Sequence, residues 1–94
     1  MRSFTSRRFR GMYASLPEDV KQRCKRAYQL FRTNPTHPGL NFKKVEGQND
    51  VYSARIGLGY RALGRLDGEE IVWFWIGRHA EYDKLLRGSG PISN

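Results

Sequence analysis

The residues whose types could carry chemistry lie in the second half of the chain. Arg55 and Arg61 fall in strand-like segments, and Arg78, His79 and Tyr82 follow closely after another such segment. Guanidinium groups bind phosphate through paired N–H donors and stabilise the charge that develops during phosphoryl transfer. An imidazole gives or takes a proton near neutral pH. Because RNA supplies its own nucleophile, the 2′-hydroxyl, these side chains together could cut an RNA strand without a metal ion.

The turns between the strands decide whether these side chains converge. Asp67-Gly68 is a strong two-residue hairpin signal, and the register it predicts places Arg61 opposite Phe74, at the end of the hairpin away from the turn. The connection at residues 57–59 leads to the same end. If that loop has three residues, Arg55 pairs with Arg61 on one face; if it has two, they point to opposite faces. The alternative bases, or partners for the arginines, are Glu81 and Asp83.

The first third of the chain has the periodicity of two amphipathic helices. Apolar residues at 9, 12, 13 and 16 follow one helical face, and those at 16, 20, 24, 27 and 31 continue it. The sequence therefore predicts a short helix followed by a longer one over roughly 16–33, which Asn34-Pro35 ends. Two helices so close in sequence should form an αα-hairpin.

From residue 40 the apolar pattern changes to a period of two. It predicts strands over 40–45, 51–56, 60–66 and 70–76, and a short helix over 79–87. The last strand is apolar on both faces, which is typical of a central strand covered on both sides. We expect an α+β domain over 1–87, in which an N-terminal αα-hairpin packs on a four-stranded antiparallel sheet. Residues 1–7 could add an edge strand, and 88–94 should be a flexible tail.

Charge and composition limit the classes of partner and site. The 94 residues carry a formal net charge of +8, and residues 1–32 hold nine basic side chains against two acidic ones. This excess is either an ordinary basic helical surface or a surface for nucleic acid or an acidic protein. No apolar run is long enough for a membrane span and no secretory signal is recognisable, so we expect a cytoplasmic protein. Cys24 and two histidines lack the spacing of a zinc site, and no cofactor is expected.

Several short motifs, taken together in their order along the chain, resemble those of the RelE/ParE superfamily of toxins from type II toxin–antitoxin modules. The resemblance is nearest to the YafQ- and YoeB-like branch of that superfamily. They are Leu16-Pro17, the segment 34–40, Phe42-Lys43, the segment 52–56, Gly59-Tyr60-Arg61 and the segment 75–82. The resemblance implies a metal-independent endoribonuclease that cleaves mRNA on the ribosome. It also implies an acidic antitoxin as partner, besides mRNA and ribosomal RNA.

The resemblance also implies roles for individual residues. Arg61 matches the arginine that stabilises the scissile phosphate, and Arg55 aligns with a basic strand position of the nucleases. His79 resembles the late proton-transferring histidine, and His37 is similar to a loop histidine of the site. Tyr82 comes three residues after His79, whereas the YafQ-like pattern places an aromatic residue four after the late histidine. The candidates for binding RNA are Lys43, Lys44 and Arg78.

The same superfamily includes toxins that do not cleave RNA, so two other functions stay open. A ParE-type toxin has this fold, inhibits DNA gyrase and cuts no RNA. A toxin-derived domain that has lost its activity would serve only as a binding module. The sequence favours the nuclease because His79, Arg61 and Arg55 are present together.

Overall fold

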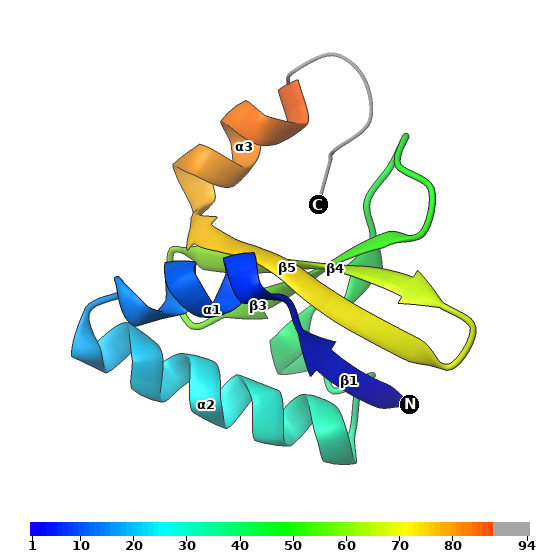
Figure 1. Cartoon of the computed structure of the whole chain (residues 1–94), viewed down its shortest axis with the longest axis horizontal. Helices are drawn as coiled ribbons and strands as arrows, with labels where there is room; N and C mark the ends of the chain where they lie inside the picture. The colour runs from blue at the N-terminus through cyan, green and yellow to red at the C-terminus, as the bar shows by residue number, and fades with distance from the viewer. Residues whose placement is uncertain (88–94) are drawn as a thin grey trace.

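One five-stranded sheet forms the centre of the molecule, in the strand order β1-β5-β4-β3-β2 (Figure 1). The computed structural model describes residues 1–87, so the expected tail at 88–94 lies outside the described residues. The elements in chain order are β1 (Arg2–Thr5), α1 (Arg7–Ala14), α2 (Glu18–Thr33), the 3-10 turn η1 (Pro38–Leu40), β2 (Lys43–Lys44), β3 (Val51–Ile56), β4 (Tyr60–Asp67), β5 (Glu70–Arg78) and α3 (His79–Arg87).

The α+β class, the αα-hairpin and the possible edge strand within residues 1–7 are confirmed, but the sheet has five strands in place of four and is not wholly antiparallel. β1 adds a fifth strand that runs parallel to β5, with Arg2 beside Glu70 and Thr5 beside Trp73. Its outward-facing carbonyls are occupied by side chains: the Tyr28 hydroxyl donates to Ser3 O at 3.1 Å, and Arg10 donates to Thr5 O at 2.5 Å. A four-residue edge strand has too short a pattern to reveal its partner, because it pairs with a segment almost seventy residues away.

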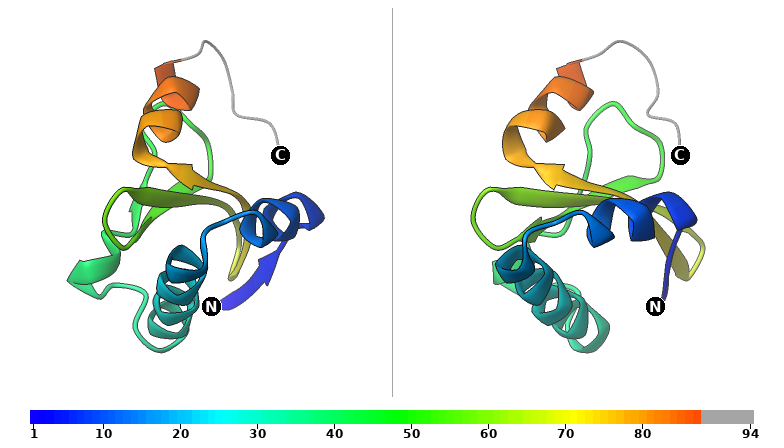
Figure 2. Two further views of the ribbon diagram at one scale, coloured as in Figure 1. Left: turned by 90° about the vertical axis from the view of Figure 1, so that its left-hand side faces the viewer. Right: turned by 60° about the vertical axis from the view of Figure 1, so that its left-hand side comes forward.

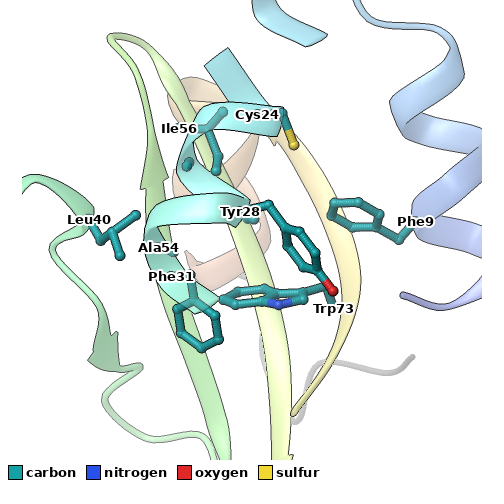
Figure 3. A pocket seen from close by; sticks show the side chains of 10 residues that line it. Phe9, Cys24, Tyr28, Phe31, Leu40, Ala54, Ile56 and Trp73 are labelled. Carbon is teal, nitrogen blue, oxygen red and sulfur yellow. The ribbon is translucent and has the colours of Figure 1, made fainter. Parts of the chain in front are cut away.

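The αα-hairpin lies on one side of the sheet, with α2 across the face and α1 beside β5, and α3 covers part of the other face (Figure 2). α1 begins at Ser6, whose side-chain oxygen accepts from the Phe9 N–H at 3.1 Å. The core on the hairpin side centres on Trp73, where aromatic side chains from both helices gather (Figure 3). Phe31 of α2 meets the Trp73 ring edge-on, with ring centroids 5.3 Å apart.

β5 is apolar on both faces, as predicted, because a hydrophobic core lies on each side of it. Trp73 and Ile76 belong to the hairpin-side core, whereas Phe74 and Trp75 belong to the α3-side core. The consecutive residues Phe74 and Trp75 share a face because a β-bulge interrupts the ladder between β4 and β5. Gly64 pairs with Trp73, but Leu63 pairs with Trp75, which leaves Phe74 unpaired.

The bulge and the turn together correct the predicted register. The two central turn residues are Gly68 and Glu69, and Gly68 comes first with φ +61°, as a type II′ turn requires. This turn shifts the partners by two residues relative to the predicted Asp67-Gly68 turn, and the bulge at Phe74 shifts them by one more. Arg61 therefore lies opposite Gly77, not Phe74.

None of the helices in residues 1–87 combines the length and apolar character that a bilayer crossing needs.

Candidate active site

The β3–β4 connection has three residues, which settles the relation of the two arginines. Arg55 and Arg61 are direct cross-strand neighbours, so their side chains leave the same face of the sheet. The loop turns at Gly57, which has φ +59° and whose carbonyl oxygen accepts from Arg55 Nε at 3.3 Å. The hairpin therefore places two guanidinium groups side by side near its tip.

α3 begins beside this hairpin and adds the histidine. The backbone N–H of His79, the first residue of α3, donates to Gly59 O at 2.8 Å. This bond ties the start of the helix to the loop between β3 and β4. The result is a hollow of about 350 Å³ lined by Arg55, Gly57, Leu58, Gly59, Tyr60, Arg61 and His79.

Tyr82 packs against both Arg61 and His79. Its side chain is buried, and the guanidinium carbon of Arg61 lies 5.4 Å from the centroid of its ring. The His79 ring meets the same tyrosine edge-on at 5.9 Å. Tyr82 in turn packs against Trp75, with centroids 6.4 Å apart. Arg61 and His79 are thus held by one aromatic side chain that belongs to the core.

Ser53 is a site residue that the sequence reasoning missed. It is fully buried, and its hydroxyl accepts a long hydrogen bond of 3.5 Å from Arg61 Nη1. A small polar residue at an inward-facing strand position between apolar neighbours was the available signal. Ser53 also pairs with Lys43 of β2, so Lys43 leaves the sheet on the same face as Arg61.

Arg65 extends the same basic face along β4. It stands four residues from Arg61, so both side chains leave the same side of the strand. Its guanidinium carbon lies 5.7 Å from the Phe74 ring centroid, and its Nη1 donates to Asn49 O at 3.4 Å. The α3 face of the sheet therefore carries arginines both at the hollow and beyond it.

Three of the predicted residues lie elsewhere. Lys44 pairs with Tyr52, and Arg78 pairs with Tyr60, which places both on the face that the αα-hairpin covers. His37 caps the N-terminus of η1, where its Nδ1 accepts from the Gly39 N–H at 3.0 Å. That turn is anchored in the hairpin-side core through the buried Leu40. The structure brings together Arg55, Arg61, His79 and Tyr82.

Neither a metal site nor a reactive thiol stands out in the described part of the chain. Within residues 1–87, no three side chains of His, Cys, Asp or Glu are grouped so that they could hold a metal ion. Cys24 is buried in the hairpin-side core, and this burial raises the pKa of its thiol to about 11. The thiol is therefore neutral near pH 7 and a poor nucleophile.

Solved structures of toxins share this fold. The RelB–RelE antitoxin–toxin complex from Methanococcus jannaschii matches with a TM-score of 0.70 and 19% identity, covering 86% of this chain and 96% of that chain. The archaeal RelE–RelB complex from Pyrococcus horikoshii OT3 gives 0.65 and 21%, covering 82% and 92%. YafQ from E. coli gives 0.67 and 13%, covering 87% and 98%.

A family model also identifies a toxin domain in this chain. Curated protein sequences give no match to this chain. The family model of the ParE-like toxin domain matches residues 18–84, which include α2, the β3–β4 hairpin and the first part of α3. The chain therefore belongs to the ParE-like toxin domain family.

Proposed function

We propose that the protein is the toxin of a type II toxin–antitoxin system and that it cleaves mRNA on the ribosome as a metal-independent endoribonuclease. The observation that carries the proposal is the convergence of Arg55, Arg61 and His79 on one hollow, above the buried Tyr82. Two cations and a proton-transferring group are the parts that RNA cleavage by an internal nucleophile needs.

The proposed reaction uses the 2′-oxygen of the substrate as nucleophile. The 2′-oxygen loses its proton and bonds to the adjacent phosphorus, while the bond from phosphorus to the 5′-oxygen breaks. The products are a 2′,3′-cyclic phosphate and a 5′-hydroxyl, which takes up a proton. His79 is the group that transfers a proton, and Arg61, assisted by Arg55, stabilises the added negative charge on the phosphate oxygens. Tyr82 and Ser53 fix Arg61 for this task.

Reconstituted translation with the purified protein tests the proposal. New mRNA 5′ ends are mapped by primer extension, with naked mRNA in parallel. We expect cuts in translated mRNA and a loss of about 100-fold or more in His79→Ala and Arg61→Ala. Arg26→Ala, an exposed arginine of α2, is the matched control and should cut like the wild type. Wild-type cleavage by both site variants would refute the assignment.

Gyrase inhibition is the second candidate, because the family model that matches is the ParE-like one. A gyrase inhibitor would block supercoiling by purified gyrase, leave translated mRNA intact, and keep its effect in His79→Ala. A module that has lost its activity would do neither, and its expression would not slow growth.

We propose further that an acidic antitoxin binds the protein at the groove between α1 and α2. RelE is bound to RelB in the structures from M. jannaschii and P. horikoshii. The groove here has a volume of about 570 Å³ and mostly apolar walls. The aromatic residues that line it are Phe9, Tyr13 and Tyr28, and the basic ones are Arg10, Lys25 and Arg32. An amphipathic acidic segment complements such a surface in both charge and polarity.

Charge reversal tests this surface. We expect a neighbouring gene to encode the acidic antitoxin. The double variant Lys25→Glu/Arg32→Glu should bind that antitoxin at least 10-fold more weakly, measured by calorimetry, while mRNA cleavage persists. Lys84→Glu on α3 changes an exposed lysine outside the groove and is the matched control. Equal affinity of the double variant and the wild type would exclude the groove as the binding surface.

A further inference from the structure

His79 has a carboxylate partner on its own helix. Asp83 lies four residues after His79 on α3, and its Oδ2 is 3.5 Å from His79 Nδ1. The two side chains are 53% and 51% exposed, respectively, so the ring is both held and accessible to a substrate. Residues four apart on a helix lie above one another, which makes this pair a consequence of the local sequence.

The contact distinguishes the two ring nitrogens. Nδ1 faces Asp83, which leaves Nε2 as the nitrogen available to a molecule in the hollow. The backbone of His79 is fixed by the bond to Gly59 O, and its ring is fixed edge-on against Tyr82. A histidine that donates one ring N–H to a carboxylate is held in a single tautomer and presents the other nitrogen as an acceptor.

We propose that Asp83 is a positioning residue that holds His79 with Nδ1 protonated and Nε2 facing the hollow. When Nε2 takes the proton of a 2′-hydroxyl, the carboxylate of Asp83 stabilises the imidazolium that forms, and that proton passes on to solvent or to the leaving oxygen. Asp83 touches no substrate and acts through His79. The catalytic part of this inference rests on the proposed nuclease function.

His79 lies between two arginines and a carboxylate, whose charges act on its ring in opposite directions. The guanidinium groups of Arg55 and Arg61 line the same hollow from β3 and β4, and they disfavour a positive charge on the ring. Asp83 offsets them from α3. Glu81 is also on α3, but residues two apart on a helix do not face each other. Removing the carboxylate of Asp83 should therefore weaken the preference of His79 for the tautomer with Nδ1 protonated, and removing that of Glu81 should not.

NMR of the histidine rings tests the pair independently of any activity. We expect Asp83→Asn to change the ¹⁵N shifts that report the tautomer of His79, because Nδ1 loses the carboxylate beside it. Asp83→Glu should restore part of the wild-type shifts. His37 is the internal reference, and Glu81→Gln is the matched control variant. An unchanged His79 in Asp83→Asn, or an equal change in Glu81→Gln, would overturn the proposal.

The rate of mRNA cleavage gives the second readout. In Asp83→Asn the rate should fall about 10-fold, in kcat rather than in KM, because Asp83 acts through His79 and touches no substrate. A wild-type rate in a folded variant would overturn the catalytic part. If the wild type cuts no RNA, the proposed function fails, whereas the ¹⁵N shifts still decide whether Asp83 orients His79.

Discussion

Substituting Gly77 tests how the core supports the site. Gly77 is buried, and a Cβ atom added there would lie 2.8 Å from Cη2 and Cζ2 of the Trp75 ring. Carbon atoms normally pack about 3.5–4.0 Å apart, so the ring would have to retreat by roughly 1 Å. Overpacking of this kind costs about 1–3 kcal/mol in the free energy of unfolding. For a domain of this size, that lowers Tm by about 5–20 °C.

Gly11→Ala provides a control with the same chemical change and the opposite sign. Gly11 is exposed within α1, and nothing lies within 4 Å of a Cβ atom added there. Replacing a helical glycine with alanine stabilises a helix by about 0.5–1 kcal/mol, so Tm should rise by a few degrees. Thermal unfolding followed by circular dichroism measures both variants against the wild type.

The same pair of variants separates stability from function. Trp75 packs on Tyr82, which supports Arg61, so Gly77→Ala should also lower mRNA cleavage at temperatures where the variant is fully folded. Gly11→Ala should not. A Gly77→Ala protein that melts at the wild-type temperature would refute the packing argument, because the Trp75 ring would then have room to spare.

Three further predictions concern single contacts. Ser6→Ala should lower the free energy of unfolding by about 1 kcal/mol in urea titrations, because it removes the cap on the Phe9 N–H. Tyr28→Phe should cost about 1 kcal/mol and speed amide exchange in β1, because Ser3 O loses its donor. Burial raises the pKa of Cys24 from 9.0 to about 11, so below about pH 8 the thiol is protonated in both the folded and the unfolded state and does not change the pH dependence of stability. As the pH rises through 9 the unfolded thiol ionises first, and between about pH 8 and pH 10 the wild type should lose about 1 kcal/mol more stability than Cys24→Ala.

The local pattern of apolar residues was sufficient to predict the helices and most of the strands. The helical periodicity through Phe9, Cys24 and Phe31 identifies residues that do lie in the hairpin-side core. The alternation in β3 and β4 is equally plain, because one face of each strand packs on that core. Such patterns arise from burial on one side, which any short window of sequence records.

Register and long-range pairing could not be predicted in the same way. The bulge at Phe74 depends on how β5 meets β4, and no residue of that apolar run marks it. The turn signal Asp67-Gly68 was located correctly but misread by one position, since Gly68 takes the first central place. Each error moved the expected partner of Arg61.

The candidate site was predicted in part because its residues are brought together by short connections. Arg55 and Arg61 flank a three-residue loop, and His79 and Tyr82 follow β5 directly on one helical turn. His37 is separated from them by the sheet, which no local pattern could indicate. Ser53 was missed because a serine in a strand becomes informative only once its diagonal neighbour on β4, Arg61, is known.

The pairing of β1 with β5 has a consequence for how the chain folds. Arg2 lies beside Glu70, so this contact closes a loop of almost seventy residues, whereas the β3–β4 and β4–β5 hairpins close loops of a few residues. Closing a long loop costs more chain entropy than closing a short one, so the hairpins should form early and β1 should dock last. In refolding experiments, the amides of β1 should therefore gain protection in the final phase, after the β3–β5 meander is already formed.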